Sequence, residues 1–424
     1  LPPAAPSWHP GPCGVVQLAD GSYQVDQCRA WVSGNEGEGF GYQVRSGELA
    51  SGPAVAAGAI CLLTPAPCNT GIRLLRAEDR GLLALASHTW LREYGGDGYL
   101  GIGFDFVGAV GPSEEPLVAD NDHHGLVALR EPSMWPDVIT ADHADLLFPI
   151  ESSVAYTEHC GDVTGNGHAD LCHRSGYTRV FEGPVTPQSQ PWMTLLQLVA
   201  PGSPGAVGTF GADGPAMITG IHTYDQSRGG VAYHPLLPGD HTVEASDVRF
   251  AGTDGQRVGD GIGAGDLDVD GDLELVLGET YDDERTGKVR VYDDTPEDPF
   301  GELLLELFGQ RRHARFGMAS LVADLDGDGH PDLVVAAPGG SFGDVPGSVH
   351  IFPGPVDHIS WDTAVTWSSG AVGFDHFGYS LEAFDEDGDG DLELFVGAPR
   401  FSEVEVWAGA VFSIDDPLRT GNAQ

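Results

Sequence analysis

The clearest copy of a unit that recurs along this chain begins at Phe316-Gly317 and continues as Ala323-Asp-Leu-Asp-Gly-Asp-Gly-His-Pro-Asp-Leu-Val-Val-Ala-Ala-Pro338. Asp alternating with Gly is typical of a tight polar turn. The apolar residues that follow have the length and composition of a buried strand. A second strand-like run, residues 347–352, closes the copy. The unit therefore predicts a strand, an acidic turn and further short strands.

Two other segments align with this copy almost without gaps. Val258-Gly259 precedes residues 265–278, and Phe377-Gly378 precedes residues 384–399. Earlier copies are degenerate and lie at residues 76–86, 118–129, 160–172 and 210–220. The first acidic residue of each turn is Asp79, Asp120, Asp162, Asp213, Asp266, Asp324 or Asp385, at spacings that rise from 41 to 61 residues.

A repeat of this length with several short strands has the size of one four-stranded blade of a β-propeller. Stacking the blades around a ring buries their apolar faces, and closing the ring hides the strand edges. We therefore expect an all-β fold, a seven-bladed β-propeller over residues 71–414. An eighth blade stays open, because Phe40-Gly41 and residues 53–58 faintly resemble the same unit. We expect residues 1–70 to supply a disulfide-tied cap and a ring-closing strand, and residues 415–424 to form a tail.

Four of the turns share the pattern Asp-x-(Asp/Thr)-x-(Asp/Asn)-Gly-x-x-(Asp/Glu), at residues 162–170, 266–274, 324–332 and 385–393. Ca²⁺ prefers several oxygen ligands, and the side chains at positions 1, 3, 5 and 9 and the carbonyl at position 7 can converge on one ion. Without a cation, such close carboxylates would repel one another. An EF-hand is excluded, because its Glu at position 12 is replaced here by His173, Leu277, Val335 and Val396. The sequence therefore predicts about four Ca²⁺ sites.

The order of Phe-Gly, Asp-rich turn and Gly-Ala-Pro resembles the FG-GAP repeat of integrin α-subunit propellers, most strongly over residues 255–414. This resemblance implies that the turns bind Ca²⁺ and brace the blades, while partners bind through other loops. It implies these ligands, with the residue at position 7 contributing its carbonyl: Asp162, Thr164, Asn166, His168 and Asp170; Asp266, Asp268, Asp270, Asp272 and Glu274; Asp324, Asp326, Asp328, His330 and Asp332; Asp385, Asp387, Asp389, Asp391 and Glu393. The first set carries fewer charges, so we expect it to bind more weakly.

The chain is strongly acidic, with 64 acidic and 20 basic side chains, and its only Lys is Lys288. Such a surface repels phosphate backbones, so nucleic acid is a poor partner. Four Ca²⁺ ions would neutralise part of the excess. Solubility or salt adaptation explains the remainder better than a surface that binds cations or cationic partners, but the acid excess alone does not separate the two. No apolar stretch is long enough to predict a membrane span.

Six cysteines fall into three close pairs: Cys13 with Cys28, Cys61 with Cys68, and Cys160 with Cys172. Short-range pairs in an even number indicate disulfides and an oxidising compartment, although six cysteines allow 15 pairings. The first residues resemble those of a mature exported chain. We therefore expect a secreted or cell-surface protein.

Three classes of function stay open. We expect a non-catalytic module that binds an extracellular protein or carbohydrate. The alternatives are a secreted hydrolase or lyase that uses the propeller as a substrate platform, and a structural subunit of a surface assembly. Residues 339–343 match GxSxG, but no strand-to-helix turn is expected there. His123, His124 and His143 lie near acidic residues, but solvated loops explain them better than a transition-metal site. Some of the tryptophans could stack on sugars, although we expect most of them to pack in the blade cores.

Overall fold

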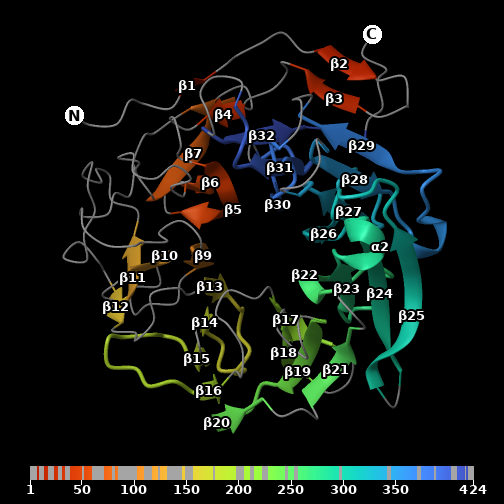
Figure 1. Ribbon diagram of the computed structural model, residues 1–424. Helices are drawn as coiled ribbons and strands as arrows, with labels where there is room; N and C mark the ends of the chain where they lie inside the picture. Colours follow the sequence, from red (N-terminus) through yellow and green to blue (C-terminus); the bar gives the residue numbers. More distant parts are fainter. Residues whose placement is uncertain are drawn as a thin grey trace.

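The computed structural model describes an all-β chain whose strands form separate sheets placed around a ring (Figure 1). The described residues are 7–8, 14–17, 23–26, 31–33, 39–49, 52–59, 71–78, 82–84, 103–108, 117–122, 125–130, 146–148, 156–174, 177–196, 205–210, 214–221, 228–243, 247–252, 256–295, 298–340, 345–369, 374–385, 388–402, 408–415 and 417–418. No helix within these residues is long and apolar enough to cross a membrane.

Seven sheets are formed by the described strands. The first sheet contains β5 (Phe40–Leu49), β6 (Gly52–Ala59), β7 (Gly71–Glu78) and β8 (Leu82–Ala84), and the second contains β9 (Asp105–Gly108), β10 (Leu117–Asp122), β11 (Gly125–Arg130) and β12 (Leu146–Phe148). The third sheet contains β13 (Tyr156–His159), β14 (Leu171–Arg174), β15 (Tyr177–Phe181), β16 (Met193–Leu196) and β20 (Gly239–Thr242). The fourth contains β17 (Gly205–Thr209), β18 (Pro215–Gly220), β19 (Gly230–Pro235) and β21 (Val248–Ala251). Neighbouring strands in these four sheets pair antiparallel, except that β20 joins β16 in parallel.

The last three sheets carry the best-preserved repeats. The fifth sheet contains β22 (Val258–Gly265), β23 (Glu274–Glu279), β24 (Lys288–Thr295) and β25 (Asp298–Phe308). The sixth contains β26 (Ser320–Ala323), β27 (Asp332–Ala337), β28 (Ser348–Phe352) and β29 (Val365–Ser368). The seventh contains β30 (Ser380–Phe384), β31 (Glu393–Ala398) and β32 (Ala410–Ile414). The short helices α2 (Asp282–Arg285) and η4 (Val356–His358) lie in connections. The middle strands β23, β27 and β31 are buried throughout, because a neighbouring sheet covers each of their faces.

The N-terminal strands extend two of these sheets. β4 (Trp31–Ser33) pairs antiparallel with β32, and β1 (Ser7–Trp8) pairs with β4. β3 (Tyr23–Asp26) pairs in parallel with β29, and β2 (Gly14–Gln17) pairs with β3. The last sheet is therefore built from both ends of the chain, and the all-β arrangement is consistent with a propeller.

The Phe-Gly pairs lie at the junctions between neighbouring sheets. Phe316 is 1% exposed and forms a parallel bridge with Gly287 of the preceding sheet. Its N–H donates a hydrogen bond to the carbonyl oxygen of Thr286 at 3.0 Å. Gly317 then adopts a φ of +92°, and a Cβ there would lie 2.8 Å from the carbonyl oxygen of Lys288. The Phe fills the junction, and the Gly allows the two backbones to approach.

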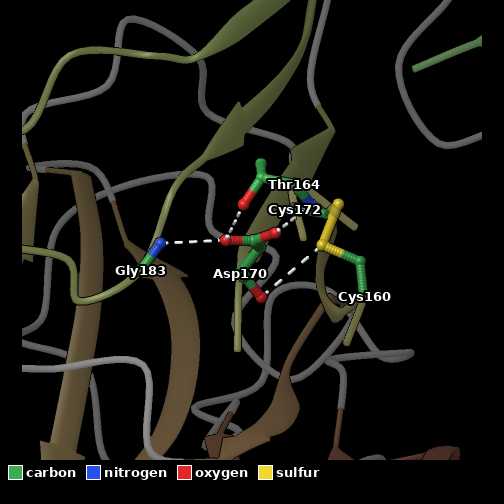
Figure 2. The surroundings of a disulfide bond; sticks show 5 residues. All are labelled: Cys160, Thr164, Asp170, Cys172 and Gly183. Carbon is green, nitrogen blue, oxygen red and sulfur yellow. Dashed lines mark hydrogen bonds between the residues drawn. A yellow bond between two sulfur atoms is a disulfide. The ribbon is translucent and has the colours of Figure 1, made fainter. Parts of the chain in front are cut away.

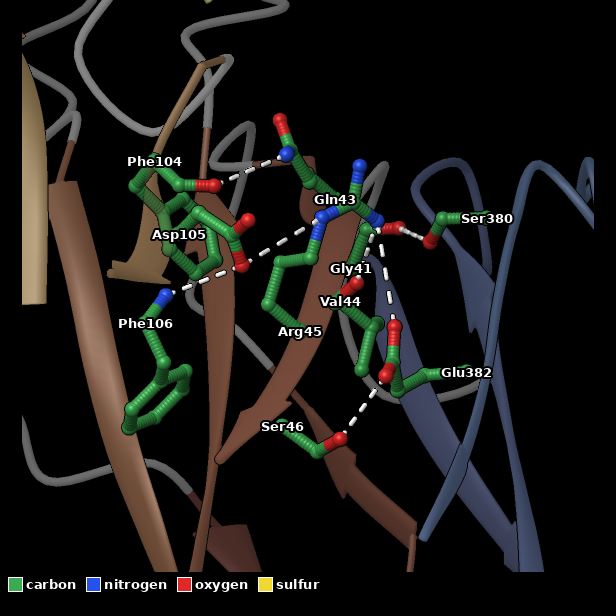
Figure 3. Close-up of polar contacts among 10 residues, drawn as sticks. All are labelled: Gly41, Gln43, Val44, Arg45, Ser46, Phe104, Asp105, Phe106, Ser380 and Glu382. Carbon is green, nitrogen blue, oxygen red and sulfur yellow. Dashed lines mark hydrogen bonds and ion pairs between the residues drawn. The ribbon is translucent and has the colours of Figure 1, made fainter. Parts of the chain in front are cut away.

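The same junction joins the first sheet to the last. Phe40 is fully buried, bridges to Gly409 and donates its N–H to the carbonyl oxygen of Ala408 at 3.0 Å. Gly41 follows with a φ of +85°. Its carbonyl oxygen accepts a hydrogen bond from Ser380 Oγ at 3.1 Å (Figure 3). The ring is thus closed by the contact that joins the repeats inside it.

Arg45 on β5 connects the first strands of three successive sheets (Figure 3). Its Nε lies 3.9 Å from Asp105 Oδ1 on β9, and its Nη1 lies 3.9 Å from Glu382 Oε2 on β30. Ser46 Oγ donates to Glu382 Oε1 at 2.7 Å. Burial raises the pKa of Glu382 to about 7, and Arg45 opposes that rise. These contacts supplement the apolar junction with polar links at the closure.

The strand pairing differs from the sequence expectation in the N-terminal third. Residues 40–49 pair with residues 52–59, which in turn pair with residues 71–78, so one sheet spans residue 70, where the sequence suggests a boundary. Phe40-Gly41, considered only as a faint eighth copy, begins the first sheet. Asp120 lies inside β10 rather than in a turn, and Asp79 follows β7, outside the described residues. A single Asp marks a turn but does not specify which turn of a sheet it occupies.

Candidate metal centres

The four acidic loops occupy equivalent places, each between the first and second strands of a sheet. They connect β13 to β14, β22 to β23, β26 to β27 and β30 to β31. In every loop, the side-chain Oδ1 at position 5 accepts the N–H of position 7. These pairs are Asn166 with His168 at 2.8 Å, Asp270 with Asp272 at 3.0 Å, Asp328 with His330 at 2.8 Å, and Asp389 with Asp391 at 3.0 Å. The repeated hydrogen bond shows that the four loops have the same turn conformation.

The Asp at position 1 holds the start of each turn. Asp324 accepts the N–H of Asp328 at 3.1 Å and that of Gly329 at 2.9 Å. Asp162 makes the equivalent two bonds at 3.0 and 2.7 Å. Asp385 accepts from Gly388 at 2.7 Å and from Gly390 at 3.0 Å. Because the backbone N–H groups bind these carboxylates from one side, the remaining lone pairs of their oxygens are available to a cation.

Two loops bring three carboxylates together. One oxygen from each of Asp266, Asp268 and Glu274 lies within 4.8 Å of the others, and Asp324, Asp326 and Asp332 form a matching group. These are positions 1, 3 and 9 of the predicted pattern, and Asp270 and Asp328 at position 5 are outside the groups. The first loop has only two acids among its side-chain ligands, and Asp387 of the fourth lies outside the described residues.

Glu274 carries the clearest indication that this loop binds a cation. Its Oε2 accepts the N–H groups of Leu267 and Asp268, whereas its buried Oε1 has no hydrogen-bond partner. Burial raises the pKa of Glu274 to about 8, and the nearby charges of Asp268 and Asp293 add to the rise. An unpartnered buried carboxylate oxygen is costly unless a charge neutralises it. A divalent ion held by Asp266, Asp268 and Glu274 would supply that charge.

The third loop has the same chemistry with a shorter acid at position 9. Burial raises the pKa of Asp332 to about 6, against the lowering effect of N–H donors from Gly354 at 3.0 Å and Leu325 at 2.8 Å. The pKa of Asp326 is also raised, by burial and then by Asp328 and Asp324. All of these ligand atoms are hard oxygens, the kind that Ca²⁺ and Mg²⁺ take. The residues present therefore fit the ion that the repeat implies.

Strand register divides the four loops into two kinds. Where position 9 is Asp, a Gly two residues beyond its paired strand donates to it: Gly183 N–H to Asp170 at 2.9 Å, and Gly354 N–H to Asp332 at 3.0 Å. Where position 9 is Glu, the strand register places Asp293 opposite Glu274 and Asp415 opposite Glu393. The two kinds of loop thus differ in whether a Gly N–H donates to position 9, a difference that is apparent only once the strands are paired.

A disulfide closes the base of the first loop (Figure 2). Cys160 and Cys172 are bonded, with their Cα atoms 5.9 Å apart, as the sequence predicts. Asp170 lies between them in sequence and accepts Thr164 N–H at 2.9 Å. The covalent link therefore holds together the loop that has the fewest charges for a cation. Cys13, Cys28, Cys61 and Cys68 lie outside the described residues.

Position 4 of the second loop is strained. Positions 4 and 6 have positive φ in all four loops, and position 4 is Gly165, Gly327 or Gly388 in three of them. In the second loop it is Val269, with a φ of +65° and 55% exposure. A β-branched residue is strongly disfavoured there. We expect Val269→Gly to stabilise the chain by about 1 kcal/mol, after the backbone entropy of Gly is subtracted. Urea unfolding in excess Ca²⁺ measures this change, and Val269→Ala, which keeps a Cβ, should recover less.

Comparisons with known proteins agree with this geometry. Residues 316–352 match the FG-GAP repeat family. Integrin alpha-4 of Xenopus laevis is 35% identical over 152 residues, which make up 34% of this chain and 14% of the relative. Phosphatidylinositol-glycan-specific phospholipase D of Homo sapiens is 39% identical over 113 residues, 24% of this chain and 13% of that protein. The chain therefore carries an FG-GAP repeat and is distantly similar to both proteins, although it matches only a small part of each.

A solved structure supports the fold over nearly the whole chain. A crystal structure of BBS1N in complex with ARL6DN, soaked with mercury, aligns with a TM-score of 0.51 at 12% identity. The alignment covers 93% of this chain and 99% of that one. At this identity the likeness concerns the fold alone.

The other candidate residues from the sequence receive little structural support. His123, His124 and His143 lie outside the described residues, as do residues 341–343 of the GxSxG match. Trp367 is 6% exposed and belongs to the core between the last two sheets. Trp361 is half-buried against Phe316, Phe352 and His350.

Proposed function

We propose that this chain is a seven-bladed β-propeller that is exported, holds about four Ca²⁺ ions in its strand-connecting loops and binds a protein or glycan partner without catalysis. The observation that carries the proposal is the recurrence of one acidic turn at four equivalent places, with an unpartnered buried carboxylate oxygen in one of them. The seven sheets and the bridge from Phe40 to Gly409 support the blade number and the closed ring.

The metal loops themselves are poor partner sites. Their carboxylates are engaged by the turn, and a bound ion would occupy the oxygens that remain. The connections between second and third strands lie at the other ends of the same strands. They differ in length and sequence among the sheets, as expected of loops that select a partner. Export is supported by the disulfide between Cys160 and Cys172.

Binding and catalysis are separated by two measurements on the same preparation. A glycan array and a defined panel of extracellular proteins should give saturable binding in Ca²⁺. Incubation with phosphatidylinositol-glycan and polysaccharide substrates should give no product. The phospholipase named among the relatives makes the second assay necessary. Turnover that a point substitution abolishes would replace the proposal with an enzyme, and absence of any partner would favour a structural subunit.

A further inference from the structure

A pocket of about 390 Å³ opens between the fifth and sixth sheets. One wall is the connection from β25 to β26, including Arg311 and Phe316, and the other is formed by β28, β29 and Trp361. The volume falls within the range of small-ligand sites. The pocket is remote from the acidic loops in sequence and in strand position, because its polar residues lie on the third and fourth strands of their sheet.

Four polar side chains form the floor of this pocket. Ser348 pairs directly with Ser368, and His350 with Thr366, so all four project from one face of β28 and β29. The opposite face of the same two strands, Val349, Ile351, Val365 and Trp367, is buried in an apolar core.

The neighbouring sheets use the same positions differently. In the fifth sheet the equivalents of Ser348 and His350 are Lys288 and Arg290, whose charges are paired with Glu279 and Glu306. In the seventh sheet they are Ala410 and Phe412, which are buried in the core. Among these three sheets, only the sixth presents neutral hydrogen-bonding groups from this face to a cavity. The equivalent positions are ion-paired in the fifth sheet and packed in the core in the seventh. Neutral polar groups that face a cavity at these positions of the sixth sheet therefore indicate a ligand.

The hydrogen bonds of the floor leave a donor for that ligand. His350 lies between two hydroxyls, with Nε2 3.0 Å from Ser348 Oγ and Nδ1 2.8 Å from Thr366 Oγ1. Burial, and to a lesser extent the charge of Arg311, lowers the pKa of His350 to about 3, so the ring is neutral. A neutral imidazole donates through one nitrogen and accepts through the other. The hydroxyl that accepts from the ring keeps its own O–H, which has no acceptor among the described residues.

One arginine lines the mouth of the pocket in a chain of net charge −44. Arg311, Arg312 and Arg315 fall within five positions of one connection. Arg312 pairs with Glu284 at 2.9 Å and Arg315 donates to the Tyr281 hydroxyl at 2.9 Å. Arg311 is exposed, lines the pocket and forms no ion pair within the described part of the chain. Guanidinium groups recognise carboxylates with matched geometry.

Trp361 supplies an aromatic edge. Its indole N–H donates to the carbonyl oxygen of Phe308 at 2.9 Å, and its ring packs on Phe316 and His350 with centroids 5.3 and 5.0 Å apart. The ring is therefore fixed at the side of the pocket, where it can contact the C–H groups of a polyol.

We propose that this pocket binds one carboxylate-bearing sugar unit of a glycan. Arg311 would pair with the carboxylate, the free hydroxyl of Ser348 or Thr366 would donate to a sugar oxygen, and Trp361 would cover one side of the ring. The assignment deepens the proposed binding function and rests on it, since it names the glycan class and the site.

Titration calorimetry with glucuronate in Ca²⁺ tests the assignment, with glucose and acetate as the two halves of the ligand. We expect saturable binding of glucuronate and at least tenfold weaker binding of glucose and of acetate. Arg311→Gln should weaken glucuronate about tenfold, and the isosteric Thr366→Val severalfold. The matched control is Arg312→Gln, which removes the neighbouring charge outside the pocket and should change the affinity by no more than about twofold.

Several results would contradict the assignment of this pocket to a carboxylate-bearing sugar. If glucose or acetate binds as tightly as glucuronate, the ligand is not recognised as a carboxylate-bearing sugar and the proposed ligand class is wrong. An Arg311→Gln chain that melts normally and binds glucuronate normally would remove the site, and so would a wild-type chain that does not bind it. If the glycan array detects neutral glycans while glucuronate fails, the pocket assignment is wrong and the proposed binding function survives.

Discussion

Removal of Ca²⁺ with a chelator should lower the melting temperature by roughly 10 °C or more. An ion that binds only the folded chain stabilises it by about 2.7 kcal/mol per site when its concentration is a hundredfold above Kd. Four such sites together would amount to roughly 10 kcal/mol. Differential scanning calorimetry with and without EGTA measures the shift. An unchanged melting curve would show that the acidic turns do not depend on a cation.

The pH dependence of this loss has a defined sign. The pKa of Glu274 is raised from 4.5 to about 8 by burial. Without a cation, the protonated acid therefore stabilises the fold below about pH 4.5, and that contribution is lost as the pH rises through about 8. A bound cation stabilises the ionised form and opposes this loss. The difference in melting temperature between the Ca²⁺-loaded chain and the chain freed of Ca²⁺ beforehand should accordingly be larger at pH 8 than at pH 5.

A single-site variant separates cation binding from general effects of charge. Asp326→Ala should be destabilising in Ca²⁺, because one carboxylate of the third group is lost. In EGTA the same change should be nearly neutral, since burial and then the charges of Asp328 and Asp324 already disfavour the ionised form of Asp326. Asp362→Ala, at an exposed residue outside the loops, is the matched control. An equal cost of Asp326→Ala with and without Ca²⁺ would contradict the site.

The sequence predicts most strongly those features that each repeat determines locally. The acidic turns, the strands beside them and the Cys160–Cys172 bond all depend on residues close together in the chain. The blade boundaries near the N-terminus depend on pairing across tens of residues, as between Phe40 and Gly409, and Asp79 and Asp120 carry no such information. For the same reason the pocket beside Arg311 is not apparent from the sequence. Its floor requires the register of β28 and β29, and its mouth comes from the connection between β25 and β26.

Gly41→Ala is expected to destabilise the chain by more than about 3 kcal/mol, through the closure of the ring. A Cβ at this position would lie 2.2 Å from the carbonyl oxygen of Ala410, which belongs to the backbone of β32 and cannot rotate away. The positive φ of +85° adds the left-handed penalty. Relief of the clash requires the first and last sheets to separate, so the contacts of Phe40 and Ser380 would be lost as well.

A glycine with the same sign of φ but free space separates the two causes. Gly52 has a φ of +116°, and a Cβ added there would meet no atom within 4 Å, so Gly52→Ala should cost only about 1 kcal/mol. Hydrogen exchange should also differ, because a ring opened at the closure uncovers β5 and β32 where the first and last sheets meet, while the junction at Phe316 stays intact. If both variants unfold at the same denaturant concentration, or if protection falls evenly around all sheets, the junction between the first and last sheets does not hold the ring closed. A selective loss at β5 and β32 would instead show that the ring depends on close backbone contact at this one glycine.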